Sequence, residues 1–287
     1  MPSRRVAFLD VFAERPLSGN GVAVVDDADG VSDEVMLAFA KETRLSETTF
    51  VQSAEAEGAH YRNRIWTPGE ELAFAGHPSL GTAVAVARWR NKSEASFVQE
   101  TGSGLHPIEV REEGEAWRSS ILLAETRFGP ELDPAEAMRA LGLEPGDAHP
   151  ELAPQMASTG IFHALAPIAD ALALARIEPD YPAIDALIGP HEGVVLYPVS
   201  VDPDEGRARA RGFSRIVELG EDPATGSAAG PLCAYLDRYA GCRAVTISQG
   251  EEMGRPSVLE AETAEGGRVR LNGSVRPLIE GTVELPG

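Results

Sequence analysis

The two halves of this sequence carry the same succession of residues, and this internal repeat restricts the possible folds more than any other feature. The copies are Arg62-Asn63-Arg64-Ile65-Trp66-Thr67, then Glu71 and Gly76, and Arg209-Ala210-Arg211-Gly212-Phe213-Ser214, then Glu218, Glu221 and Gly226. They lie 211 − 64 = 147 residues apart at the arginines and 226 − 76 = 150 residues apart at the glycines. Each copy is typical of a strand ending in an aromatic residue, a polar loop, a turn of small residues and a buried helix. We therefore expect two similar α+β halves with a cleft between them; the alternative is chance similarity in a chain rich in Ala, Gly and Arg.

The length of the chain agrees with two domains, since single hydrophobic cores stop growing near about 250–300 residues and this chain has 287. The character of the sequence changes around residues 125–133, where Pro and Gly interrupt it. We expect an N-terminal half over residues 1–124, completed by residues 276–287, and a C-terminal half over residues 125–275. With 43% hydrophobic and 24% charged residues, the composition is that of a folded globular protein.

Hydrophobic periodicity and turn residues predict short strands and a few helices along both halves. The first expected helix starts after Ser32, whose side chain can cap it, and ends near Thr43. A second starts at His77 and is apolar on every side, which is typical of a buried helix. The expected strands are residues 6–12, 22–25, 48–52, 61–67, 95–101, 105–110, 117–123, 245–249, 257–261 and 269–271, and the further helices are residues 134–141 and 228–239.

The charge of the chain limits the partners that it can bind. There are 25 Lys and Arg against 45 Asp and Glu, a formal net charge of −20. A surface of this sign repels phosphate backbones and anionic lipids, so we expect neither a nucleic acid nor a membrane as partner. Cys233 and Cys242 lack a metal-binding spacing. We also expect a cytoplasmic protein, because the N-terminus does not read as a cleavable leader and no run reaches the about 20 apolar residues of a membrane helix.

The strongest local features are two helix starts, Ala75-Gly76-His77-Pro78-Ser79 and Asp222-Pro223-Ala224-Thr225-Gly226-Ser227. The N-terminus of a helix presents unpaired backbone N–H groups and a partial positive charge, so small residues that let a ligand approach make it an anion site. Two such starts that face each other would clamp a small molecule bearing a carboxylate. The alternative is that Gly76 and Gly226 only allow tight turns under close packing.

Three side chains near these starts are candidates for acid/base chemistry. His77 would be held neutral by the field of its helix and could carry a proton, the alternative being a satisfied structural histidine. Glu47 lies between a short loop and an apolar strand, where partial desolvation would raise its pKa into the range of a general acid or base. An exposed Glu at the start of a strand would have the same local sequence. Asp222, which precedes Pro223, is equally compatible with an ordinary N-cap.

Motifs of several common enzyme classes are missing from the sequence. It contains no Gly-rich nucleotide-binding pattern, no H-E-x-x-H zinc motif and no G-x-S-x-G nucleophile motif. A pyridoxal phosphate enzyme needs a Schiff-base lysine, and the only lysines are Lys41 in an expected surface helix and Lys92 in an expected loop. For an enzyme, the sequence therefore favours acid/base chemistry without a cofactor.

Five segments together resemble the phenazine-biosynthesis isomerase (PhzF-like) family, which shares the diaminopimelate epimerase fold. They are Asp10-Val11-Phe12 with Ser18-Gly19-Asn20-Gly21, Ser46-Glu47-Thr48-Thr49-Phe50-Val51, Thr67-Pro68 through Glu71 to Gly76-His77-Pro78, Glu221-Asp222-Pro223-Ala224-Thr225-Gly226-Ser227-Ala228, and Gln249-Gly250 with Met253-Gly254-Arg255-Pro256-Ser257. They follow the order of the family and span nearly the whole chain. The resemblance implies two pseudo-symmetric α+β halves, each a mostly antiparallel β-sheet or barrel wrapped around a central helix, with the active site between them.

The resemblance also implies a cofactor-free isomerase that moves a proton, and with it a double bond, in a small substrate bearing a carboxylate. By motif, Glu47 is the general acid/base, and His77 and Asp222 assist proton transfer or hold the substrate. The residues expected to contact the substrate are Asn20, Gly76, Ser79, Thr225, Gly226 and Ser227. We expect a homodimer, which is common in the family.

Two other functions stay open. One is a racemase or epimerase that uses Glu47 and Asp222 as bases on opposite faces of the substrate. The related epimerases use two cysteines at the helix starts, where this chain has Ala75 and residues 222–224, so a two-thiol mechanism is not expected. The other is a small-molecule binding protein of the same fold that has lost turnover.

Overall fold

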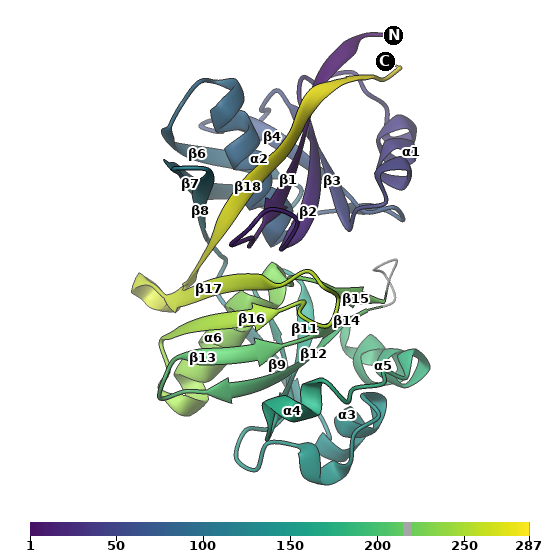
Figure 1. Cartoon of the computed structure of the whole chain (residues 1–287), viewed down its shortest axis with the longest axis vertical. Helices are drawn as coiled ribbons and strands as arrows, with labels where there is room; N and C mark the ends of the chain where they lie inside the picture. Colours follow the sequence, from purple (N-terminus) through teal and green to yellow (C-terminus); the bar gives the residue numbers. More distant parts are fainter. Residues whose placement is uncertain (215–219, 287) are drawn as a thin grey trace. The chain divides into compact units, whose positions relative to one another are not determined.

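The structure, a computed structural model, describes residues 1–214 and 220–286, and its chain divides into two units (Figure 1). Unit 1 contains Met1–Leu122 and Asn272–Gly287, and unit 2 contains Leu123–Leu271. Unit 2 begins at Leu123, 125 − 123 = 2 residues before the expected boundary. The return to unit 1 begins at Asn272, 276 − 272 = 4 residues before the expected one. Glu218, one of the residues of the sequence repeat, lies outside the described residues.

Unit 1 is built from strands and two helices. The strands are β1 (Ser3–Val11), β2 (Asn20–Val25), β3 (Glu47–Gln52), β4 (Tyr61–Trp66), β5 (Glu71–Leu72), β6 (Glu94–Thr101), β7 (Gly104–Glu113), β8 (Ala116–Leu122) and most of β18 (Val269–Glu284). The helices are α1 (Asp33–Thr43) and α2 (Gly76–Trp89). Helix α1 starts as expected, because the Ser32 side chain accepts a hydrogen bond from the backbone nitrogen of Val35.

The strands of unit 1 close into an eight-stranded barrel in the order β1, β2, β3, β4, β6, β7, β8, β18 and back to β1. Helix α2 packs against seven of these strands, which are β1, β2, β3, β4, β6, β7 and β8. Residues 76–87 of α2 are all buried, which explains why the helix is apolar on every side. The prediction of a buried central helix is thus confirmed.

Unit 2 repeats this plan with additional helices on its outer face. Its strands are β9 (Arg127–Glu131), β10 (Gln155–Ser158), β11 (Phe162–Ile168), β12 (Gly193–Asp202), β13 (Arg207–Ala210), β14 (Gly212–Phe213), β15 (Glu221–Asp222), β16 (Ala244–Gln249) and β17 (Ser257–Thr263). Its α-helices are α3 (Pro134–Ala140), α4 (Ala171–Leu174), α5 (Tyr181–Ile188) and α6 (Gly226–Ala240), and three single 3₁₀ turns are Pro145–Asp147, Gly189–His191 and Glu265–Gly267. Helix α6 packs on β10, β11, β16 and β17.

The two units share the same pair of strand–helix–strand connections. In unit 1, α1 joins the parallel strands β2 and β3, and α2 leads from β4 to its parallel neighbour β6. In unit 2, α4 and α5 lie between the parallel strands β11 and β12, and α6 leads from β13 to its parallel neighbour β16. The neighbouring strands of the hairpins, such as β1 with β2, β3 with β4, β6 with β7, β12 with β13 and β16 with β17, are antiparallel, so each unit is mostly antiparallel. The sequence repeat corresponds to a repeated fold.

Strand β18 corrects the expected short strand at residues 269–271. It runs for 16 residues and continues from unit 2 into unit 1, where it pairs with β1 over the whole length of β1 (yellow in Figure 1). The sequence did not predict this length, because Asn272-Gly273 is a common turn signal. In the structure these two residues continue the strand.

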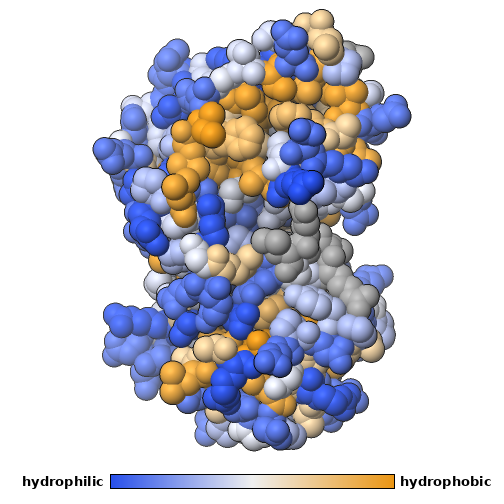
Figure 2. Space-filling view, turned by 45° about the vertical axis from the view of Figure 1, so that its right-hand side comes forward, coloured by the Kyte–Doolittle hydropathy of each residue, from blue (hydrophilic) through white to orange (hydrophobic). Residues whose placement is uncertain are grey.

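Each unit has its own apolar core in addition to the central helix. In unit 2 this core lies between β11 and the outer helices α3 and α5. In unit 1 a second core lies under α1 and includes Met36, Phe50 and Trp66. Figure 2 shows that apolar side chains also reach the surface of unit 1, bordered by hydrophilic ones. Of the described helices, none has the length and apolar character that crossing a membrane requires.

Candidate active site

Glu47 and His77 form the centre of the candidate site in unit 1. Glu47 is the first residue of β3 and pairs in register with Val22 of β2, and His77 is the second residue of α2. Glu47 Oε2 lies 3.3 Å from His77 Nε2, and the two side chains are 15% and 6% exposed. The structure therefore brings together, in a nearly water-free place, two of the three side chains predicted to do acid/base chemistry.

The His77 imidazole is neutral over the physiological pH range. Burial lowers its pKa to about 3, and a backbone hydrogen bond with Gly21 opposes the shift only in part. A neutral imidazole carries one ring proton, so Nε2 faces Glu47 as a donor in one tautomer and as an acceptor in the other. His77 can thus give a hydrogen bond to a Glu47 carboxylate or take one from a Glu47 carboxylic acid.

Asn20 lies on the other side of the His77 ring. Its Nδ2 is 3.4 Å from His77 Nδ1, and its Oδ1 is 3.5 Å from the hydroxyl oxygen of Ser46, which donates to it. Asn20 therefore connects His77 with the residue that precedes Glu47. That Asn20 contacts the substrate stays a prediction.

The loop before Asn20 is held by hydrogen bonds at its base. The backbone nitrogen of Leu17 donates to Asp10 Oδ2 at 2.9 Å, and Arg276 donates to the carbonyl oxygens of Ala13 and Glu14. Gly19 has a φ of +70°, and a side chain there would come within 2.3 Å of the carbonyl oxygen of Val11. These contacts hold the loop in one conformation, which fixes the position of Asn20 at the start of β2.

The start of α2 is held from inside the barrel by Ser79 and Gln99. Ser79 is completely buried; its hydroxyl donates to the carbonyl oxygen of Ala75 at 2.7 Å and accepts from Gln99 Nε2 at 2.8 Å. Gln99 Oε1 accepts from the Tyr61 hydroxyl and from Asn63 Nδ2. The Ser79 hydroxyl thus links the start of α2 to Gln99. Contact of Ser79 with the substrate stays a prediction.

The corresponding site in unit 2 surrounds Asp222 at the end of β15. Asp222 is buried, and its Oδ2 accepts a hydrogen bond of 2.8 Å from the hydroxyl of Thr225. Gln249 Nε2 donates to the Asp222 carbonyl oxygen at 2.7 Å, and Gln249 Oε1 accepts from the backbone nitrogen of Thr225 and from the Tyr197 hydroxyl. Asp222 and Thr225 are thus joined by a buried network just before α6.

Both central helices start without a side-chain cap. The N-cap residues are Ala75 for α2 and Thr225 for α6, and neither side chain accepts a hydrogen bond from its own helix, whereas α1, α3, α4 and α5 are all capped by a side chain. The first helical residues, Gly76 and Gly226, are buried, and Ser227 follows as a partly buried residue. Helix starts of this kind suit the binding of an anion.

Sequence reasoning missed Gln99 and Gln249 as parts of the two sites. Each holds the start of a central helix from the parallel strand that follows that helix. They are 249 − 99 = 150 residues apart, the same spacing as Gly76 and Gly226, so the repeat itself contained the signal. Within residues 1–214 and 220–286, no group of three or more His, Cys, Asp or Glu side chains is arranged to hold a metal ion.

Comparisons with known proteins identify the family of this chain. The family model described as phenazine biosynthesis-like protein (PhzC-PhzF) matches residues 9–281. A relative from Pseudomonas aeruginosa named trans-2,3-dihydro-3-hydroxyanthranilate isomerase is 36% identical over 276 residues, which cover 93% of each chain. A protein of the same name from Pseudomonas chlororaphis is 34% identical and covers 96% of this chain and 98% of its own.

Solved structures show the same fold over the whole chain. A protein of Pseudomonas aeruginosa described as a predicted epimerase superimposes with a TM-score of 0.86 at 33% identity, covering 98% of this chain and 99% of its own. A PhzF-family protein of Bacillus anthracis superimposes with a TM-score of 0.84 at 26% identity, covering 99% and 100%. A hydroxyproline epimerase of Agrobacterium vitis, at 14% identity and a TM-score of 0.63, shares the fold. The chain therefore belongs to the phenazine biosynthesis-like (PhzF) family and is an isomerase of that family.

Proposed function

We propose that the protein is a cofactor-independent isomerase that moves a proton, and with it a double bond, in a small substrate bearing a carboxylate. The observation that carries the proposal is the 3.3 Å approach of Glu47 Oε2 to the buried, neutral His77 at the start of α2. A carboxylate in such a place is a suitable general base, and a neutral imidazole beside it can orient it without adding charge.

In the proposed reaction, the Glu47 carboxylate takes a proton from one carbon of the substrate, and the electrons of that C–H bond form the new double bond. The electrons of the original double bond form a C–H bond with the proton that Glu47 returns to another carbon. The reaction needs no oxidant or reductant, because the same number of protons and electrons leaves and enters the substrate. His77 Nε2, 3.3 Å from Glu47 Oε2, is placed to orient the Glu47 carboxyl group, and the uncapped N–H groups at the start of α2 stabilise negative charge on the substrate. Asp222 and the start of α6 are proposed to hold the substrate or to assist the transfer.

The relative that is 36% identical indicates which substrate to test first. Its name includes trans-2,3-dihydro-3-hydroxyanthranilate, a ring that bears a carboxylate. We propose ring carboxylates of this kind as the substrate class of the present chain.

The test is isomer formation in D₂O, followed by NMR, with trans-2,3-dihydro-3-hydroxyanthranilate and related ring carboxylates. Glu47→Gln should lower the rate by about 10²–10⁴-fold, the usual contribution of a general acid/base. Glu42→Gln, which changes an exposed residue of α1, is the matched control and should leave the rate unchanged. Equal rates for wild type and Glu47→Gln would contradict the role of Glu47, and inversion of a stereocentre without a bond shift would identify an epimerase instead.

A further inference from the structure

Arg211 and Glu221 form a buried ion pair with two parallel hydrogen bonds. Arg211 Nε and Nη2 each lie 2.8 Å from one of the two carboxylate oxygens of Glu221, and the side chains are 10% and 13% exposed. Arg211 Nη1 also donates to the carbonyl oxygen of Leu174 at 2.7 Å. Paired charge-assisted hydrogen bonds of this kind are strong and directional, so the Glu221 side chain is held in one orientation.

The pair fixes the short hairpin of β14 and β15, on which Asp222 lies. Phe213 pairs with Glu221 and Gly212 pairs with Asp222 across this hairpin. The guanidinium carbon of Arg211 lies 4.8 Å from the centre of the Phe213 ring, so Arg211 contacts both strands. Because Asp222 follows Glu221 directly, any rotation of the Glu221 backbone changes the direction of the Asp222 carboxylate.

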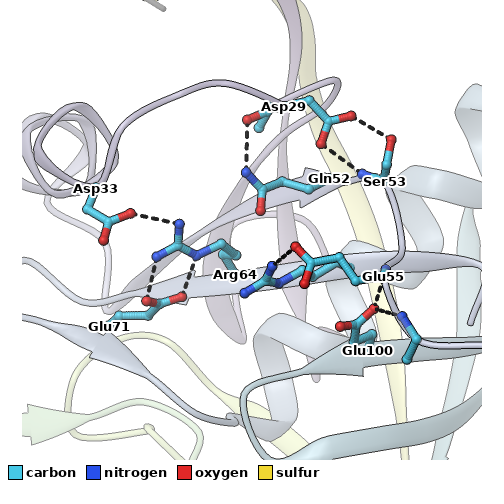
Figure 3. A network of polar contacts seen from close by, with 11 residues as sticks. Asp29, Asp33, Gln52, Ser53, Glu55, Arg64, Glu71 and Glu100 are labelled. Carbon is cyan, nitrogen blue, oxygen red and sulfur yellow. Dashed lines mark hydrogen bonds and ion pairs between the residues drawn. The ribbon is translucent and has the colours of Figure 1, made fainter.

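Unit 1 contains the same arrangement at the equivalent positions. Arg64 Nε and Nη2 each lie 2.6 Å from one oxygen of Glu71, and Arg64 Nη1 also contacts Asp33 of α1 (Figure 3). Glu71 pairs with Trp66 across its hairpin, and the Arg64 guanidinium carbon lies 5.5 Å from the centre of the Trp66 ring. In both units the pair braces the hairpin that leads into the central helix, which indicates a common role in placing the helix start.

We propose that the Arg211–Glu221 pair is a positioning device for Asp222. The two side chains hold the hairpin in the conformation in which the Asp222 carboxylate accepts from Thr225, and they act on the reaction through Asp222 without touching the substrate. This inference rests on the proposed function, in which Asp222 holds the substrate or assists proton transfer.

The informative variant removes both charges together. Removing only one partner leaves a buried charge uncompensated and destabilises the fold, whereas two apolar residues of similar length leave no such charge. The double variant Arg211→Met/Glu221→Met therefore keeps the packing and removes the directional bonds. The single variant Arg211→Lys keeps the positive charge but cannot form the two parallel hydrogen bonds, so it should not restore the rate.

The chain offers a matched control two residues earlier in the sequence, on β13. Arg209 Nη2 lies 2.6 Å from Glu252 Oε1, the Arg209 side chain is 32% exposed, and Glu252 follows β16 outside the hairpin that carries Asp222. Arg209→Met/Glu252→Met thus removes an Arg–Glu pair from the same unit, and with it the 3.0 Å contact of Arg209 Nη2 with Glu251 Oε2. It should leave kcat and KM within about twofold of wild type, as expected of a surface pair.

The experiment is a double-mutant cycle on the rate of isomer formation. Arg211→Met/Glu221→Met should lower kcat by about tenfold to a hundredfold in the wild-type background, because misplacement of a group by about 1 Å has effects of this size. In an Asp222→Asn background the same change should lower kcat by less than about threefold, since residues that act through one another are not additive. A merely structural role would lower kcat equally in both backgrounds, and that result would overturn the proposal.

A crystal structure of Arg211→Met/Glu221→Met gives a second measurement that does not depend on activity. The proposal expects the 2.8 Å contact between Asp222 Oδ2 and the Thr225 hydroxyl to be lost or displaced. An unchanged Asp222 would overturn it even if wild type proved inactive on every substrate tested. Different results would overturn the proposed function itself. These are a wild-type protein that is inactive on every substrate tested, or a Glu47→Gln variant that is as active as wild type.

Discussion

His163 is buried in β11, and neither of its ring nitrogens has a hydrogen-bond partner in the described part of the chain. Its neighbour Ala164 points into the core formed with α3 and α5, so the alternation of the strand turns His163 to the other face, where α6 packs. Burial lowers the pKa of His163 to about 4. An unsatisfied buried polar group costs about 1–3 kcal/mol, so this residue weakens the fold at neutral pH.

We expect His163→Leu to raise the stability of the protein and to reduce its sensitivity to acid. The imidazole titrates near 6.5 in the unfolded chain and near 4 in the fold, so below pH 6.5 the unfolded state binds more protons. The free energy of unfolding therefore falls as the pH drops from 6.5 to about 4, by about 3 kcal/mol for this group at about 1.4 kcal/mol per pKa unit. Urea midpoints at pH 7 and pH 5 measure both effects. His163→Asn, which keeps a polar group in place, is the control, and a lower midpoint for His163→Leu at pH 7 would contradict the explanation.

His77 should stay neutral throughout the range in which the enzyme can be assayed. Since burial lowers its pKa to about 3, the NMR signals of its imidazole should not shift between pH 8 and pH 5. In Glu47→Gln the signals of His77 should also stay unshifted. Burial keeps the ring neutral, and a nearby carboxylate would favour the charged imidazole, so its loss cannot raise the pKa of His77. An inflection of the His77 signals near pH 6.5 would show that the imidazole becomes charged beside Glu47. It would contradict the proposal that His77 is a neutral group that orients the general base Glu47.

At the scale of elements, Gly273 explains how β18 passes the loop that follows β1. Phe12 of this loop is completely buried and has a φ of +62°, and a Cβ added to Gly273 would lie 2.4 Å from its ring. We expect Gly273→Ala to destabilise the protein by about 1–3 kcal/mol, the usual cost of overpacking. Gly281→Ala in the same strand, where no atom lies within 4 Å of the added Cβ, should be neutral or slightly stabilising. Equal urea midpoints for the two variants would be inconsistent with this contact.

The same strand shows where sequence reasoning ends. Asn272-Gly273 has the local character of a turn, and only Phe12, about 260 residues away in the sequence, makes glycine necessary inside a strand. A local signal was sufficient where both partners of an interaction lie in one helix turn, as for the Ser32 cap of α1. Gln99 and Gln249 have no local signature, because a glutamine in a strand becomes part of a site only when a helix from elsewhere packs against it.

At the scale of the whole molecule, the repeat predicted two related α+β halves because the duplicated positions are those that fix the fold. The arginines and glutamates brace the hairpins, and the glycines start the central helices. The sequence also placed residues 276–287 in the first half, but it did not predict that one unbroken strand of 16 residues makes this return. That return depends on β18, which fills the place between β1 and β8.

We therefore expect β18 to decide whether unit 1 folds. All nine residues of β1 pair with β18, so a chain that ends at Leu271 leaves the barrel open between β1 and β8. It retains every residue of unit 2, Leu123–Leu271. Hydrogen exchange of this truncated chain should show loss of protection in β1, β2 and α2 and retained protection in β10, β11 and α6, because an open barrel no longer encloses its central helix. A chain that ends at Leu285, which keeps all of β18, is the control and should exchange like wild type. Retained protection of α2 in the shorter chain would mean that the seven other strands suffice to bury the helix.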